Sequence, residues 1–200
     1  MNYKIIVIIV ALSILNFPGE ALAEDTHLAN TQKFVGVINP LSGVYHKYGE
    51  DCQFGYDLAY NELDSEKRSL IGMKVEDDQS IPRNAVNIFR KFNTDKNLIS
   101  VGVFGSYVAL AVNPLSITSK IPVIGLAGHA DFVKNNPLAF SSWGNSTYEA
   151  YKLSEDIKHN KISRLAIITL ENDYPLYVRD SLLKALSNSN VEVVFNETIT

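Results

Sequence analysis

The stretch Val101-Gly102-Val103-Phe104-Gly105-Ser106, followed by the helix-forming run 107–119, decides the fold that we expect for this chain. Its apolar residues predict a short buried strand, and Gly105 and Ser106 predict a turn into the first turn of a helix. A helix N-terminus presents unpaired N–H groups and the positive end of a dipole, so it favours an anion such as a carboxylate. Ser106 is placed either to cap this helix or to donate its hydroxyl to an anion, and this stretch alone leaves both interpretations open.

Strand-like and helix-like segments alternate around this stretch. Strands are expected at residues 34–38, 73–76, 99–104 and 123–126, and helices at 49–63, from Pro82 onward and at 107–119. Parallel strands need crossover connections, so the alternation predicts an α/β fold, a parallel sheet with helices on both faces. Ligands of such sheets bind beyond the carboxyl ends of the strands. The turns after Ile38, Phe104 and Leu126 should therefore lie on one rim.

The rhythm of the sequence changes between Phe140 and Asn145, where we expect the chain to enter a second lobe. The expected elements there are a helix at 147–160 with Ser146 as its candidate cap, a strand at 164–170, a helix at 177–186 and a strand at 191–195. Two strands do not make a lobe with a sizeable core. The predicted organisation is therefore a first α/β lobe at 24–141 and an incomplete second α/β lobe at 142–200.

The N-terminus has the order of a secretory signal peptide. Lys4 precedes an apolar run at 5–15, and small residues follow up to Ala23. The apolar run is shorter than the roughly 20 residues that span a bilayer. We therefore expect residues 1–23 to be a cleavable signal peptide and the mature chain to be periplasmic.

Composition and motifs argue against several classes of function. The formal net charge is −4 and there is no basic run, so nucleic acid is not an expected partner. The histidines show no metal-ligand spacing, and no phosphate loop, dinucleotide fingerprint or hydrolase elbow occurs, so we expect no metal, no cofactor and no enzymatic activity. Asp77 and Asp78 are interpreted as a solvated pair at a strand end. Cys52, the single cysteine, is interpreted as a small core residue on a helix face with Tyr56, Ala59 and Leu63.

Several short motifs occur in a particular order along the chain. They are Pro40-Leu41-Ser42-Gly43, Tyr48-Gly49, Gly55, Ala59, Leu63, Asp77-Asp78, Gly102 with Ser106 four residues later, and Ile121-Pro122-Val123-Ile124. In their order and spacing the chain resembles the type I periplasmic solute-binding proteins, in the leucine/isoleucine/valine-binding group that serves ABC importers. The resemblance implies a small-molecule ligand, an amino acid or a related solute, held between two lobes, and the membrane permease of an ABC importer as partner. Members of this family continue past the elements present here, so we expect a truncated form of that architecture.

The resemblance also implies roles for five residues. Ser106 matches the serine that holds the α-carboxylate of the ligand, and the carbonyl of Ala127 matches an acceptor of the α-ammonium group. Tyr48 matches an aromatic residue of the side-chain pocket, and Tyr174 a second-lobe tyrosine that closes over the ligand. His129 stands where amino-acid-binding members usually have threonine or serine. The alternatives are that Tyr48 packs on its own helix, that His129 bonds to loop backbone and that Tyr174 simply begins a helix.

Three classes of function follow from the resemblance: a transport binding protein, a ligand-sensing receptor module of the same fold, and a truncated remnant that binds nothing. Each hydrogen bond to a charged group of the solute contributes about 1.5 to 3 kcal/mol of binding free energy, so the loss of second-lobe contacts weakens binding. Because the second lobe is incomplete, we expect this chain to bind its solute more weakly than the intact architecture would.

Overall fold

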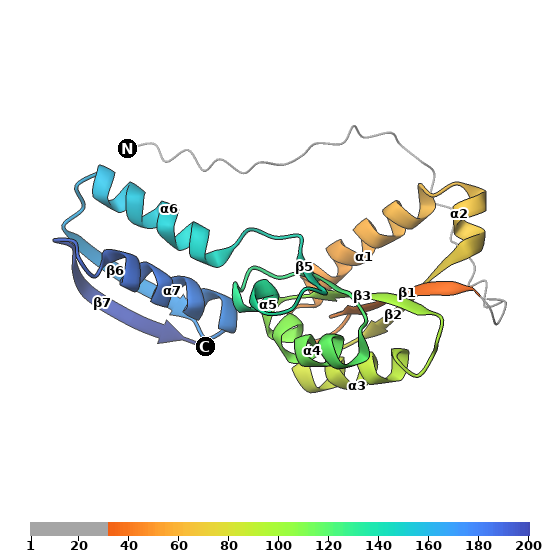
Figure 1. Ribbon diagram of the computed structural model, residues 1–200. Coiled ribbons are helices and arrows are strands. Elements are labelled where there is room, and N and C mark those ends of the chain that lie inside the picture. Colours follow the sequence, from red (N-terminus) through yellow and green to blue (C-terminus); the bar gives the residue numbers. More distant parts are fainter. Residues whose placement is uncertain (1–31) are drawn as a thin grey trace.

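The computed structural model describes residues 32–200, and the expected signal peptide lies outside the described residues. The strands are β1 (Lys33–Asn39), β2 (Ile71–Asp77), β3 (Leu98–Phe104), β4 (Val123–Leu126), β5 (Ala139–Ser141), β6 (Arg164–Leu170) and β7 (Glu192–Ile199). The helices are α1 (His46–Asn61), α2 (Ser65–Leu70), α3 (Pro82–Phe92), α4 (Ser106–Ser119), α5 (Asp131–Lys134), α6 (Ser146–His159) and α7 (Asp173–Leu186). Strands and helices alternate as the sequence predicts, with α1 and the pair α3 and α4 on opposite faces of the first sheet (Figure 1).

Within the described residues the strands form two parallel sheets. The first has the order β2-β1-β3-β4-β5, and the second pairs β6 with β7. β3 is central in the first sheet, where it pairs with β1 on one side and β4 on the other. Because all these strands run in one direction, the turns after β1, β3 and β4 lie on one rim of the sheet, as expected.

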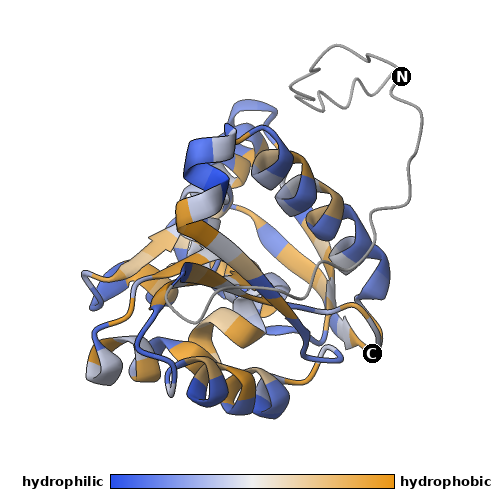
Figure 2. Ribbon diagram, turned by 90° about the vertical axis from the view of Figure 1, so that its right-hand side faces the viewer, coloured by the Kyte–Doolittle hydropathy of each residue, from blue (hydrophilic) through white to orange (hydrophobic). Residues whose placement is uncertain are grey.

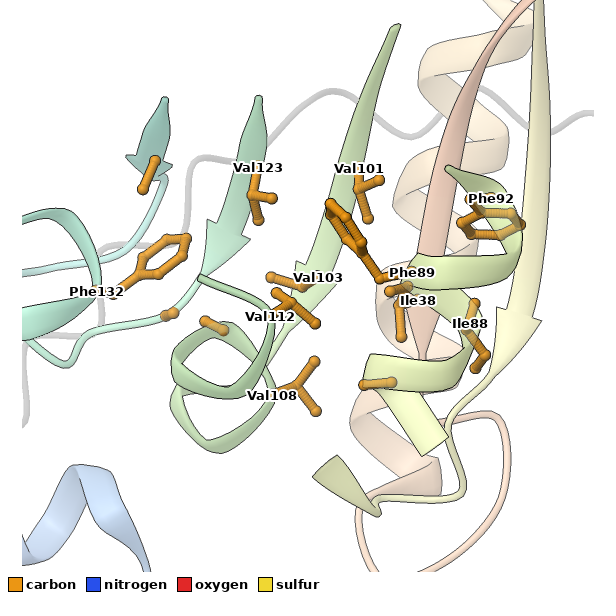
Figure 3. Close-up of a cluster of buried hydrophobic side chains, with 14 of the residues drawn as sticks. Ile38, Ile88, Phe89, Phe92, Val101, Val103, Val108, Val112, Val123 and Phe132 are labelled. Carbon is orange, nitrogen blue, oxygen red and sulfur yellow. The ribbon is translucent and has the colours of Figure 1, made fainter. Parts of the chain in front are cut away.

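The main core lies between the first sheet and helices α3 and α4. The apolar stripe predicted for α3, made of Ala85, Ile88, Phe89 and Phe92, is fully or almost fully buried. Figure 3 shows Ile88, Phe89 and Phe92 in one cluster with the valines of β3 and α4. Burying a side chain of this size contributes about 1.5 to 3 kcal/mol. This packing fixes α4, and with it the position of Ser106 at the sheet rim.

The opposite face of the sheet carries α1, which is anchored mainly at its N-terminal end. A side chain at Gly49 would collide with the carbonyl of Pro40, and Asn39 Nδ2 donates to Gly49 O at 2.8 Å. Farther along α1, Cys52 is half-buried and Ala59 is exposed. The predicted stripe is therefore wrong at Ala59, whereas Tyr56 of the same stripe is partly buried and lies against Gly102 of β3.

The second sheet has a small core of its own. Helices α6 and α7 pack together through Ala150, Ile157, Leu182 and Leu186, and both lie on one side of β6 and β7 (Figure 1). Ile168 and Leu170 of β6 are exposed.

Asn145 caps α6, so the expectation that Ser146 does so is wrong. Asn145 Oδ1 accepts hydrogen bonds from the N–H groups of Thr147 at 2.9 Å and Tyr148 at 3.3 Å. The Ser146 hydroxyl has no partner among the described residues. Asn and Ser are both good caps, and the residue with extended backbone immediately before the helix takes the role.

The structure adds one short helix and corrects two other expectations. The charged segment around Glu66 and Arg68 forms the short helix α2, because Asp64 caps it by accepting from Lys67 N at 2.8 Å. Helix α7 begins at Asp173, four residues before the expected start, because Asn172 caps it. Asp78 is fully buried, so the prediction of a solvated aspartate pair is wrong for this residue.

The hydropathy of the elements agrees with this layered arrangement. Figure 2 shows apolar residues concentrated on the strands, while polar and apolar residues alternate along the helices. Among residues 32–200, no helix combines the length and the apolar character needed to cross a membrane.

Candidate functional site

A cavity of about 530 Å³ opens beyond the carboxyl ends of β3, β4 and β6, between elements of the two sheets. Its lining comprises Tyr45, Tyr48, Asp51, Cys52, Phe104, Gly105, Ser106, Tyr107, Leu126, Gly128, Trp143, Leu170, Asn172, Tyr174 and Pro175. This volume lies in the range of about 300 to 1,000 Å³ that small-molecule sites occupy. Of the five residues predicted from the sequence, Tyr48, Ser106 and Tyr174 line the cavity together.

Ser106 lies at the first position of α4, and Gly105 precedes it as the cap residue. Gly105 has φ of 86°, a left-handed conformation that favours glycine, and an added Cβ would collide with the ring of Tyr107. The Ser106 side chain makes no cap hydrogen bond within the helix. The Ser106 hydroxyl thus lies beside the N-terminus of α4 without capping it, and its role as a donor to an anion stays a prediction.

The hydroxyl of Ser106 is oriented by the loop after β4. Its oxygen accepts a hydrogen bond from His129 N at 3.1 Å, and the residue is only 5% exposed. A hydroxyl that accepts one bond still has its own proton to donate. Among the described residues no acceptor for that proton is seen, so the Ser106 hydroxyl can donate to an anion in the cavity.

Aromatic rings make up much of the cavity wall. Tyr48 on α1 stacks on Phe104 at the end of β3, with ring centroids 6.0 Å apart and an interplanar angle of 15°. Tyr45 and Tyr107 form a second ring pair at 5.2 Å. Tyr48 therefore packs against the neighbouring strand end, and its 59% exposure leaves surface for a ligand.

Tyr174 lines the cavity from the start of α7. Its hydroxyl donates to Glu149 Oε2 on α6. Burial, together with the hydrogen bond to Glu149, raises the pKa of Tyr174 to about 12, so the phenol stays neutral. Gly128 allows the rings of Tyr174 and Trp143 to approach, since a side chain there would collide with both.

Ala127 and His129 are not among the lining residues, although Gly128 between them is. The carbonyl of Ala127 accepts the hydroxyl of Ser141 at 2.6 Å. His129 Nδ1 accepts from Asp131 N at 3.2 Å, and its ring lies 4.1 Å from the ring of Tyr177 on α7. Burial lowers the pKa of His129 despite the nearby carboxylates of Asp131 and Asp173. These contacts favour the alternative of a loop histidine, which also holds Ser106 through its main chain.

Several lining residues are absent from the set predicted from the sequence, namely Tyr45, Phe104, Tyr107, Trp143 and Asn172. Phe104 and Tyr107 flank the predicted Gly105-Ser106 turn, so their proximity to Ser106 in the sequence could have identified them as lining residues. Asn172 carries no such signal, because its Nδ2 donates to the Tyr45 hydroxyl at 2.5 Å across 127 residues of sequence. Within the described chain, no group of three or more His, Cys, Asp or Glu side chains is arranged to hold a metal ion.

Comparison with known sequences gives a consistent family match. A model of the family described as periplasmic binding protein matches residues 33–200. The Leu/Ile/Val-binding protein BraC3 of Rhizobium johnstonii is 24% identical over 180 residues, which is 86% of this chain and 49% of that protein. The chain thus spans about half the length of the curated relative that it matches.

Solved structures show the same fold at low sequence identity. One is a solute-binding protein of an ABC transporter from Rhodopseudomonas palustris BisB5, in complex with 3,4-dihydroxybenzoic acid. Its TM-score is 0.73 at 19% identity, and the match covers 84% of this chain and 47% of that chain. Another is the branched-chain amino acid transporter substrate-binding protein LivJ from Streptococcus pneumoniae, in complex with isoleucine. Its TM-score is 0.71 at 17% identity, and the match covers 84% of this chain and 50% of that chain. At these identities the likeness shows the fold alone.

Proposed function

The chain belongs to the periplasmic binding protein family, and from this premise we propose that it is the solute-binding component of an ABC-type importer. In this proposal an amino acid or a related small carboxylate binds between a first lobe at 24–141 and a second lobe that begins at 142. Residues 1–23 direct the chain to the periplasm as a signal peptide, and the importer's membrane permease receives the solute. Binding and release, with no bond made or broken, is the activity that we assign.

The observation that carries the proposal is the Ser106 hydroxyl at the N-terminus of α4, buried and with its proton available to the cavity. A carboxylate placed there accepts from this hydroxyl and from the unpaired N–H groups of the first helical turn. Isoleucine and 3,4-dihydroxybenzoic acid, bound by the two structural relatives, are both carboxylates. This shared group supports the assignment of a carboxylate site here.

The other lining residues take complementary roles. Tyr48 and Phe104 contact the apolar body of the solute from the first lobe, and Tyr174 contacts it from the second. Ala127 and His129 act from outside the lining, where His129 orients the Ser106 hydroxyl. A solute that touches both walls links the two sheets, and this link is the physical basis for closure of the lobes around a ligand.

Titration of the purified chain with small carboxylates and amino acids tests the proposal. Binding is followed by calorimetry and by NMR shifts up to millimolar ligand, for the wild type, Ser106→Ala and the control Ser187→Ala, an exposed position just after the end of α7. Because hydrogen bonds to charged groups contribute about 1.5 to 3 kcal/mol, Ser106→Ala should weaken binding about tenfold or more, and Ser187→Ala should not. A folded wild type that binds none of these solutes, or equal binding by Ser106→Ala, would overturn the proposal.

A further inference from the structure

A hydrogen bond between two side chains in the lining of the cavity joins elements of the two sheets. Asn172 Nδ2 donates to the Tyr45 hydroxyl at 2.5 Å, across 127 residues of sequence. Tyr45 lies between β1 and α1, whereas Asn172 lies between β6 and α7. Both residues line the cavity. The bond therefore links the two walls of the cavity through atoms of the chain itself.

Tyr45 is held in place by elements of the first sheet. Its N–H donates to Ser80 Oγ at 3.0 Å, on the turn after β2. Its ring packs against the ring of Tyr107 on α4, with ring centroids 5.2 Å apart. Because the main chain and the ring are both fixed, little conformational freedom is lost when the Tyr45 hydroxyl accepts a hydrogen bond.

The side chain of Asn172 is fixed as well. Its Oδ1 accepts from Tyr174 N at 3.3 Å as the cap of α7, and the residue is half-buried. The N–H of Tyr174 needs an acceptor, so the amide oxygen faces α7 and the Nδ2 donor is left for Tyr45. One amide group thus caps its own helix with the oxygen and reaches the other sheet with the nitrogen.

The bond lies away from the place where the chain passes from one sheet to the other. That passage follows β5, and there Ser142 N donates to the carbonyl of Gly125 in β4 at 2.9 Å. Tyr45 follows β1, which β3 separates from β4 in the first sheet. A second attachment at a distance from the connection restricts the rotation of one sheet relative to the other. Its loss should therefore open the cavity.

We propose that Tyr45 and Asn172 form a latch that holds the cavity closed between the two sheets before any solute binds. Both are positioning residues, since they fix the two walls relative to each other. A hydrogen bond between uncharged groups changes the ratio of two conformations about two- to tenfold. Without the latch, the open arrangement gains by this factor. The inference concerns the conformation of the chain and not its solute, so it is tested without ligand and does not depend on the function proposed above.

Cys52 is a native reporter of how open the cavity is. It lines the cavity, is half-buried and is the single cysteine of the sequence. An aromatic disulfide reagent such as DTNB reaches its sulfur faster when the cavity opens, and the reaction is followed by absorbance. The rate is measured on the purified chain for the wild type, Tyr45→Phe, Asn172→Ser and the double variant. Phenylalanine keeps the ring contact with Tyr107, and serine keeps a cap for α7.

We expect Cys52 in each single variant to react about two- to tenfold faster than in the wild type. The double variant should react about as fast as the faster single variant, because both substitutions remove the same bond. Two control variants make the same exchanges elsewhere. Tyr151→Phe removes a hydroxyl that bonds to Glu155 within α6, and Asn145→Ser changes the cap of α6. Both should leave the rate unchanged.

Equal rates in the wild type and in both single variants would overturn the latch. Rate increases that multiply in the double variant would do the same, since the two residues would then act independently. An equal increase in the control variants would mean that Cys52 reacts through general loosening of the fold, which also contradicts the inference. Far-UV circular dichroism checks that each variant is folded, and if one single variant is not, the other decides by comparison with its own control.

Discussion

Replacing Asp78 with asparagine should change how the stability of this protein depends on pH. Asp78 follows β2 and is fully buried. Its Oδ1 accepts from Ser80 N at 2.7 Å, and its Oδ2 has no partner among the described residues. Burial is the main cause that raises the pKa of Asp78 to about 6, and the neighbouring Asp77 carboxylate adds to the effect. Asparagine keeps an oxygen for Ser80 N and removes the titration.

The sign and size of the effect follow from the raised pKa. The folded state binds the Asp78 proton more tightly than the unfolded state, so this group stabilises the fold at pH below its unfolded pKa of about 3.9. That contribution is lost as pH rises through the folded pKa of about 6. Between about pH 4.5 and pH 7.5 the loss is about 2 kcal/mol of unfolding free energy, by linkage at about 1.36 kcal/mol per pKa unit.

Urea unfolding at both pH values, followed by far-UV circular dichroism, measures this quantity. We expect Asp78→Asn to gain about 2 kcal/mol relative to wild type on going from the lower to the higher pH. Asp77→Asn is the matched control, and its effect should differ little between these two pH values, because Asp77 titrates below both of them. Burial raises the pKa of Asp77, but hydrogen bonds from Ser42 and Gln79 outweigh it and hold the pKa below its usual value, so its stabilisation is lost as pH falls. An Asp78→Asn variant with the same pH dependence as wild type would refute the reasoning.

Two further substitutions have matched controls in the chain. Gly105→Ala should destabilise the fold by more than about 1 kcal/mol in urea, because its φ of 86° and the ring of Tyr107 leave no room for a Cβ. Gly55→Ala, where an added Cβ meets nothing within 4 Å, should be neutral or stabilise α1, and equal losses at both glycines would contradict this account. Asn145→Ala should cost about 1 kcal/mol through loss of the α6 cap, while Ser146→Ala should be nearly neutral, since its hydroxyl has no partner among the described residues. A larger loss at Ser146 than at Asn145 in thermal or urea unfolding would reverse the cap assignment.

Elements with clear periodicity could be predicted from the sequence. The stripe on α3 ending in Phe89 and Phe92 repeats at helical spacing and is buried as expected. The short elements α5 and β5 span only four and three residues, too few for a period to be recognised. The stripe on α1 was wrong at Ala59, because periodicity shows which residues share a face and not how closely that face meets the sheet.

The candidate site residues also differ in whether local sequence could predict their positions. The position of Ser106 at the sheet rim could be predicted from local sequence alone. Ser106 follows a strand and a glycine and begins a helix, and that order places it at the carboxyl end of the strand. Tyr48 and Tyr174 were found through the resemblance, and the structure brings both to the same cavity. The internal hydrogen bonds of Ala127 and His129 could not be anticipated, since they depend on the exact path of the loop after β4.

The sequence by itself determined the parallel sheet, its rim and the helix start at Ser106, because these depend on local periodicity and on the single direction of the strands. Only the tertiary structure decided which polar atoms at that rim remain available. Ser141 reaches Ala127 across 14 residues and Asn172 reaches Tyr45 across 127, and Asp78 is fully buried. Such contacts depend on how elements distant in sequence pack together, which local periodicity does not determine.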